Sequence, residues 1–279
     1  MPARICRPFR VIPVLSALRG VGQRTLFRQM VLADLKSGGR PLALDEEDAV
    51  LSGLFGLTAA DRPDLLAHLD GHVPFEALVG TSAEGARTIS ARKGLASLAL
   101  RPVALARFLD QMAARPERIT TLWINARASR DGVISALAEL GTEAVVVTTP
   151  DSDAMTASYQ LAKRLSARQM MQLRILYNCA TAEQGTRAHE GLADAAQRFI
   201  GLRIDCLGSV PFDPLLLREG APPPGVSRRP LHLATAGGSR PAIERVLREL
   251  NRVTPPSSHA TYANASTHSI ASTVEPSNV

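Results

Sequence analysis

Short runs of apolar residues alternate along this chain with longer segments of helical periodicity, and this alternation restricts the fold more than any other feature. Residues 144–147 are apolar at every position, which is typical of a strand buried on both faces of a parallel sheet. The pattern predicts a doubly wound α/β fold, with a mainly parallel sheet and helices on both faces. The predicted strands are residues 11–15, 42–44, 122–124, 144–149, 174–177 and 204–210. The predicted helices are residues 25–37, 103–114, 131–140, 153–167 and 186–199.

A proline, Pro13, lies inside the first predicted strand. In a doubly wound fold of this kind that strand is central, and a proline there removes one hydrogen bond from the ladder. We therefore expect either a distorted strand or a short pairing at this position.

The chain divides into one folded domain, residues 1–253, and a polar tail, residues 254–279. The tail is rich in Ser, Thr, Asn and Pro and contains no Lys or Arg. A segment with so few apolar residues cannot bury enough surface to fold, so we expect it to be disordered. Before the tail, the segment from Arg240 to Val253 has one apolar face, which predicts a helix packed on the core. The alternative for this helix is peripheral contact with a membrane or a partner.

Charge and cysteine content exclude several classes of function. The net charge is +6, but arginine supplies nearly all of the positive charge and is spread along the chain. A nucleic-acid surface would gather its cations on one element, so we predict no specific nucleic-acid binding. The three cysteines lack disulfide or zinc-site spacing, which favours a cytoplasmic protein. His68 and His72 are four residues apart, but a helix end expected between them argues against a metal site.

A glycine-containing turn joins the first predicted strand to the first predicted helix. Gly20 and Gly22 lie in this turn, which begins after Ser16. A strand, a tight turn and a helix N-terminus together direct backbone N–H groups at a bound phosphate. Two glycines are a weak signal by themselves, and Thr25 replaces the third glycine of a dinucleotide-binding fingerprint. The turn therefore predicts a phosphate-binding loop without identifying the ligand.

Five segments, in the same order along the chain, resemble those of the MinD/ParA family of P-loop ATPases. They are residues 20–26, 39–45, 144–159, 176–178 and 199–213. The last segment is similar to that of the FlhG/FleN-type flagellar number regulators, and the resemblance covers residues 10–220. It implies a P-loop NTPase-like fold and a nucleotide site at the carboxyl ends of the strands. By position, the implied nucleotide contacts are Gly20, Val21, Gly22, Gln23, Arg24, Thr25, Asp45, Asn125, Asn178, Pro211 and Asp213.

The chain departs from the family pattern at the positions that carry the chemistry. Leu18 occupies the position of the family's signature lysine, and Gln23 that of its phosphate-binding lysine. Arg24 replaces the Mg²⁺-binding threonine, and Asn125 replaces the metal-organising aspartate. Phosphoanhydride hydrolysis depends on such charges to stabilise the transferring group. We therefore predict a pseudo-ATPase with a degenerate Walker A loop and no catalytic residues; ATP or ADP binding stays open, and a Mg²⁺ site is not expected.

The leading prediction is a non-catalytic regulatory protein that acts through protein partners. It would regulate the number or placement of flagella or the organisation of a cell pole. The resemblance implies a flagellar SRP-type GTPase or a flagellar transcription activator as partner, and a homodimer is a further option. The alternative function is an active ATP-dependent switch, in which Arg24 and Thr25 would replace the family's Lys-Thr after a shift of one residue. A third option is an unrelated doubly wound enzyme with a pocket elsewhere at the strand ends. We expect a cytoplasmic location, or a peripheral one at the inner membrane face.

Overall fold

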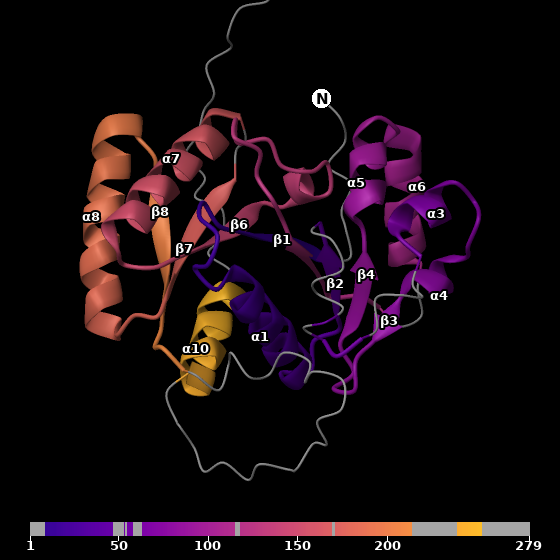
Figure 1. The fold of residues 1–279 in the computed structure, drawn as a ribbon, viewed down its shortest axis with the longest axis horizontal. Coiled ribbons are helices and arrows are strands. Elements are labelled where there is room, and N and C mark those ends of the chain that lie inside the picture. Colours follow the sequence, from indigo (N-terminus) through magenta and orange to yellow (C-terminus); the bar gives the residue numbers. More distant parts are fainter. Residues whose placement is uncertain are drawn as a thin grey trace, which may run out of the picture.

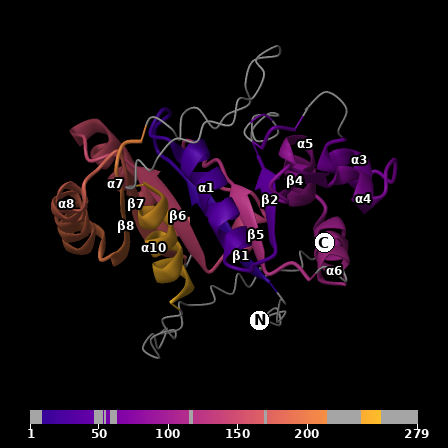
Figure 2. The same cartoon turned by 90° about the horizontal axis from the view of Figure 1, so that it is seen from below.

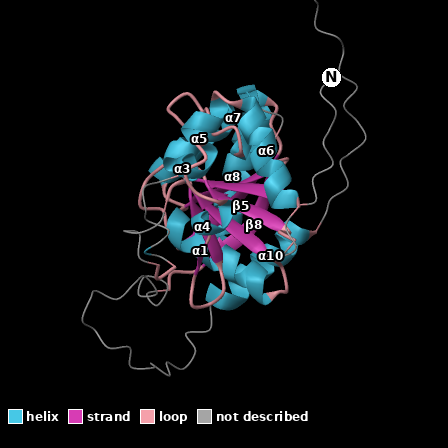
Figure 3. Ribbon diagram, turned by 90° about the vertical axis from the view of Figure 1, so that its right-hand side faces the viewer, coloured by secondary structure: helices cyan, strands magenta, loops and turns pink. Residues whose placement is uncertain are grey.

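The computed structural model describes residues 9–46, 53, 55–57, 63–114, 118–168, 171–213 and 239–252. Within these residues, one eight-stranded sheet lies between two layers of helices (Figures 1 and 3). The predicted tail, residues 254–279, lies outside the described residues. No helix among those that are described combines the length and the apolar character needed to cross a membrane.

The predicted fold class is confirmed by the order and direction of the strands. The strands are β1 (Arg10–Leu15), β2 (Pro41–Asp45), β3 (Gly80–Thr81), β4 (Arg87–Ser90), β5 (Thr121–Asn125), β6 (Glu143–Thr148), β7 (Gln172–Asn178) and β8 (Ile204–Val210). Their order in the sheet is β3-β4-β2-β5-β1-β6-β7-β8. Every neighbouring pair is parallel except β3 with β4.

Helices cover both faces of this sheet. They are α1 (Gln23–Lys36), α3 (Leu65–Leu69), α4 (Phe75–Leu78), α5 (Arg92–Ala99), α6 (Pro102–Ala113), α7 (Ser152–Arg168), α8 (Ala182–Ile200) and α10 (Ser239–Asn251). One core contains side chains of α3 to α8, and the other contains those of α1 and α10. Figure 2 shows α1 and α10 side by side on their face of the sheet. Because the apolar face of α10 is buried there, the predicted packing of this helix on the core is confirmed for residues 239–252.

One predicted helix, residues 131–140, is wrong. The structure has only a short 3₁₀ turn there, Ala138–Leu140. Ser129 Oγ accepts hydrogen bonds from the N–H groups of Asp131 (3.2 Å) and Val133 (3.0 Å), and Gly132 has φ +78°. Such local bonds offer the backbone an alternative to the helix. The short elements β3, β4 and α3 to α5 were not predicted, because few residues in each leave little periodicity to detect.

Pro13 lies in the central strand β1, between β5 and β6. The pairing of β1 with β5 runs from Arg10 to Val14, whereas the pairing with β6 includes only Val14 and Leu15. Val14 O accepts from Ala126 N (3.0 Å), so the backbone polar groups of Val14 point toward β5. Successive residues of a strand point these groups to opposite sides, so the backbone nitrogen of Pro13 points toward β6. The missing N–H therefore falls where β6 has not yet begun to pair, and the predicted short pairing is confirmed.

Candidate phosphate-binding site

The loop between β1 and α1 has the backbone conformation that a phosphate-binding turn requires. Gly20 (φ +85°) and Gly22 (φ +84°) are both in the left-handed region, which favours glycine. A Cβ at Gly22 would also lie 2.1 Å from Asn178 Nδ2, whereas nothing lies within 4 Å of a Cβ at Gly20. Gly22 caps α1, and its carbonyl accepts from Leu26 N (3.0 Å). The loop thus leads directly into the positive end of a helix dipole.

The predicted loop residues line one pocket of about 400 Å³. Arg19 and Arg24 are exposed at this pocket, and the first turn of α1 carries no acidic residue. Two guanidinium groups and a helix N-terminus suit an anion. The residues that line the pocket are Ser16, Leu18, Arg19, Gly20, Val21, Gly22, Gln23, Arg24 and Thr25.

The side chain of Gln23 turns from the loop toward the ends of the strands. Its Nε2 lies 2.9 Å from Asn125 Oδ1, 2.9 Å from Val14 O and 3.1 Å from Ala126 O. Its Oε1 accepts from Ser16 Oγ at 2.5 Å. Both ends of the Gln23 amide are therefore engaged inside the protein, and the side chain brings no positive charge to the pocket.

Asn125 continues this chain of hydrogen bonds to the next strand. Its side chain is fully buried, and Nδ2 donates to Asp45 Oδ1 at 2.9 Å. Asp45 is also buried, and it pairs with Asn125 in the register of β2 and β5. The Gln23 and Asn125 amides, which we name the amide pair, thus join the phosphate-type loop to Asp45, the last residue of β2. Buried polar groups that satisfy each other in this way stabilise one arrangement of the site.

Two of the residues that the resemblance implies as nucleotide contacts have structural partners. Asn178, at the end of β7, donates from Nδ2 to Val21 O at 2.8 Å and so holds the loop in place. Asp213 Oδ2 accepts from Ser239 Oγ at 2.5 Å, which ties the end of β8 to the start of α10. Pro211 lies in the same segment and is half-buried. The structure therefore brings the loop, Asp45, Asn125 and Asn178 together, while Asp213 bonds to α10.

The Thr-Thr-Pro-Asp segment that contributed to the family resemblance caps a helix. Asp151 Oδ1 accepts from Ala154 N at 2.9 Å, in the first turn of α7. The hydrogen bonds from the Thr149 hydroxyl and from the Ala154 N–H lower the pKa of Asp151. Its carboxylate therefore stays ionised at the helix N-terminus, where negative charge is favourable.

The site fits a phosphate better than it fits Mg²⁺. The left-handed glycines and the helix N-terminus are suited to phosphate oxygens. Mg²⁺ prefers carboxylate and hydroxyl oxygens, but among the described residues no carboxylate lines this pocket and the Asp45 carboxylate is buried against Asn125. In the described part of the chain, no group of three or more His, Cys, Asp or Glu residues could hold a metal. His68 bonds to Val73 O and Gln111, so its partners are structural.

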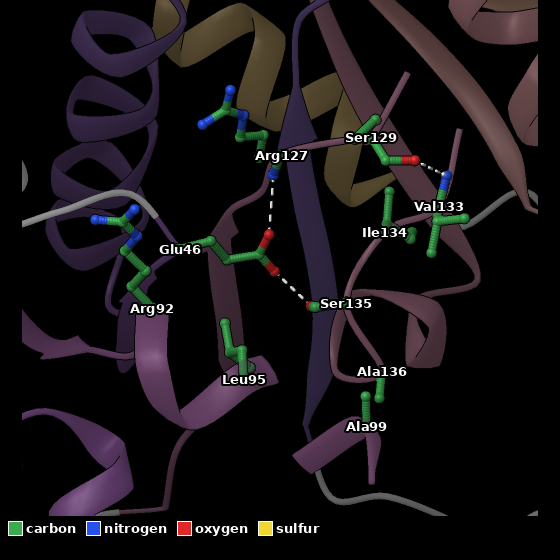
Figure 4. A pocket seen from close by; sticks show the side chains of 11 residues that line it. Glu46, Arg92, Leu95, Ala99, Arg127, Ser129, Val133, Ile134, Ser135 and Ala136 are labelled. Atoms are coloured by element: carbon green, nitrogen blue, oxygen red, sulfur yellow. Dashed lines mark hydrogen bonds between the residues drawn. The ribbon is translucent and has the colours of Figure 1, made fainter. Parts of the chain in front are cut away.

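A second pocket, of about 380 Å³, lies at the same edge of the sheet between α5 and the segment that follows β5 (Figure 4). Glu46 organises this pocket and is not among the site residues predicted from the sequence. Glu46 follows β2, and its carboxylate accepts from Arg127 N (2.9 Å) and from Ser135 Oγ. The sequence feature that could have indicated a role for Glu46 is its position just after a predicted strand, within the acidic run of residues 45–48.

Comparisons with known proteins support the fold. No protein-family model and no curated protein sequence matches this chain. A chain of the MinC:MinD cell division protein complex of Aquifex aeolicus matches with a TM-score of 0.66 and 18% identity, over 90% of this chain and 98% of that one. The Pyrococcus furiosus cell division ATPase MinD matches with a TM-score of 0.61 and 19% identity, over 86% and 98%. The ATP complex of McdA from Cyanothece matches with a TM-score of 0.60 and 14% identity, over 88% and 95%. This chain therefore has the MinD/ParA-type P-loop fold.

Proposed function

We propose that this protein is a pseudo-ATPase, a regulatory protein with the MinD/ParA-type fold that acts through protein partners and does not hydrolyse ATP. The amide pair carries this proposal, because it fills the two positions where the family pattern has a lysine and an aspartate. Gln23 and Asn125 neutralise no charge on a transferring phosphoryl group. Arg24 adds positive charge at the pocket but cannot replace a Mg²⁺ ligand.

The process that we propose is flagellar number or placement, or the related organisation of a cell pole. The similarity of residues 199–213 to the FlhG/FleN-type regulators supports it. The partner would be a flagellar SRP-type GTPase or another flagellar regulator. A partner-dependent role also agrees with the similarity to the Aquifex structure, in which MinD is in complex with MinC.

Isothermal titration with ATP and ADP, with and without Mg²⁺, tests this proposal together with a phosphate-release assay. We expect no phosphate release above the uncatalysed rate, and any heat of binding should be the same with and without Mg²⁺. The Leu18→Lys/Gln23→Lys/Arg24→Thr/Asn125→Asp variant restores the family's residues at the four departing positions and serves as the reference for a competent site. Hydrolysis of MgATP by the unaltered protein would contradict the proposal.

The alternative, an active ATP-dependent switch, is favoured by one observation. The loop keeps its two left-handed glycines, and Arg19 and Arg24 lie exposed at the pocket. Binding that requires Mg²⁺ and disappears in Arg24→Ala would support this function, because it would make Arg24 the replacement for the missing lysine.

A further inference from the structure

The second pocket has a rigid polar wall and an apolar floor. Glu46 fixes the wall by binding Arg127 N and Ser135 Oγ (Figure 4). A backbone hydrogen bond from Ser129 N to Val133 O (2.8 Å) closes the loop of residues 129–133 next to this wall. A pocket whose walls are already ordered loses little conformational entropy when a ligand binds.

The floor of this pocket is built from two elements that face each other. Leu95 of α5 and Ile134 of the opposite segment are each only 4% exposed, and Ala99 and Ala136 continue the floor toward solvent. Small alanine side chains at this end leave the space open, because larger ones would fill it. The pocket can therefore accept an aliphatic side chain.

The mouth of the pocket carries an excess of positive charge. Arg92 lines it from α5 and Arg127 from the segment after β5, and both side chains are exposed. Glu46 is the acidic residue that lines the pocket, and its carboxylate is already bound to the wall. The guanidinium group of Arg127 makes no hydrogen bond or ion pair within the described structure. Arginine binds carboxylates through two parallel hydrogen bonds, so the mouth is complementary to an acidic group.

Apolar surface continues outside the pocket. Leu100, directly after Ala99, and Val103, in the first turn of α6, are 84% and 72% exposed. Val133, which lines the pocket, is 42% exposed, and Leu100 adds exposed apolar surface beside Ala99. A small acid would cover only the pocket, whereas a polypeptide could cover the pocket and this surface.

We propose that the second pocket is a docking site for a short segment of a protein partner that alternates acidic and aliphatic residues. Carboxylates of the segment bind Arg92 and Arg127. The neighbouring aliphatic side chain enters between Leu95 and Ile134. This inference goes beyond the proposed function, because it concerns a different pocket and stands whether or not the loop binds a nucleotide.

Fluorescence anisotropy with a labelled synthetic peptide of alternating Glu and Leu tests the proposal on the full chain. We expect binding to weaken at least about tenfold in Arg127→Ser and in Arg92→Ser, and at least as much when Gln replaces Glu in the peptide. Arg203→Ser is the matched control, because Arg203 is an exposed arginine beside β8 at the far end of the sheet. It should bind as the unaltered protein does.

Three results would overturn the proposal. The first is no binding at protein concentrations up to about 1 mM. The second is equal weakening in Arg203→Ser, which would mean that net charge alone attracts the peptide. The third is equally tight binding of N-acetylglutamate, which would assign the pocket to a small acid and not to a polypeptide.

Discussion

Gln23 and Asn125 depend on each other for their hydrogen bonds. The Asn125 side chain is fully buried, accepts from Gln23 and donates to Asp45, so each polar atom faces a matching one. A charged residue at one of these positions would face the neutral amide at the other and would have no oppositely charged partner there. The pair is therefore stable as two amides, and replacing only one of them by a charged residue should destabilise the protein.

We predict that Asn125→Asp destabilises the protein by about 3 kcal/mol at neutral pH, because two buried carboxylates would then face each other. The folded state would hold a shared proton more tightly than the unfolded chain does. Stability relative to the unaltered protein should therefore fall as pH rises above about 4, the unfolded pKa of a carboxyl group. Urea unfolding at acidic and neutral pH measures this difference.

The double variant Asp45→Asn/Asn125→Asp is the control for this experiment. It restores one carboxylate and one amide, so most of the lost stability should return. Equal stability of Asn125→Asp and the unaltered protein at neutral pH would show that the two side chains do not share a buried site.

The helix α10 is an element fixed at both ends by long-range contacts. Asp213 bonds to Ser239 at its start. At its end, Arg10 donates to Leu250 O (2.9 Å) and Arg174 donates to Glu249 O (3.2 Å). Cationic donors satisfy the last carbonyl groups of a helix, and their positive charge interacts favourably with the negative end of the helix dipole. The apolar face between these ends packs on α1 and β8, so it is covered by protein in this structure.

We predict that Leu247→Ala lowers the free energy of unfolding by about 3 kcal/mol, since Leu247 is 4% exposed and its loss leaves a cavity. Arg248→Ala changes the adjacent, exposed residue and should alter stability by less than about 0.5 kcal/mol. Urea denaturation of both variants provides the comparison. A Leu247→Ala protein as stable as the Arg248→Ala protein would argue that α10 does not pack on the sheet.

At the scale of the whole molecule, both pockets lie along the carboxyl edge of the parallel strands. This edge is where doubly wound proteins place their ligands, since the loops that follow the strands converge there. One pocket is lined by the loop between β1 and α1, and the other is lined by residues that follow β2 and β5. The molecule therefore presents two cation-lined pockets on one side, which suits recognition of acidic partners.

We predict that MgATP does not change the association state of the protein. Dimerisation around a nucleotide requires tight binding of the nucleotide, and the amide pair supplies none of the charge that would hold its phosphates. Sedimentation velocity with MgATP, with ATP alone and with Mg²⁺ alone should give the same sedimentation coefficient. A doubling of mass that occurs only with MgATP would favour the alternative function, an ATP-dependent switch.

The succession of the longer strands and helices along the chain followed from the sequence by itself. Apolar periodicity reports local burial, and it located the strands β1, β2 and β5 to β8 and the helices α1, α6, α7, α8 and α10. Gly20 and Gly22 located the loop between β1 and α1. The effect of Pro13 on strand pairing was also predictable, because a missing N–H has the same consequence in any ladder. The helix predicted at residues 131–140 failed because the Ser129 side chain competes locally with helical hydrogen bonds.

The composition of the two pockets was decided only by the tertiary structure. Gln23 and Asn125 are 102 positions apart, and Glu46 and Ser135 are 89 apart. Their hydrogen bonds exist because β1, β5 and β2 are neighbours in the sheet, an order that no local pattern encodes. Sequence position could show only that Gln23 and Asn125 are neutral amides. Only the packing of the strands brings them together as a hydrogen-bonded pair.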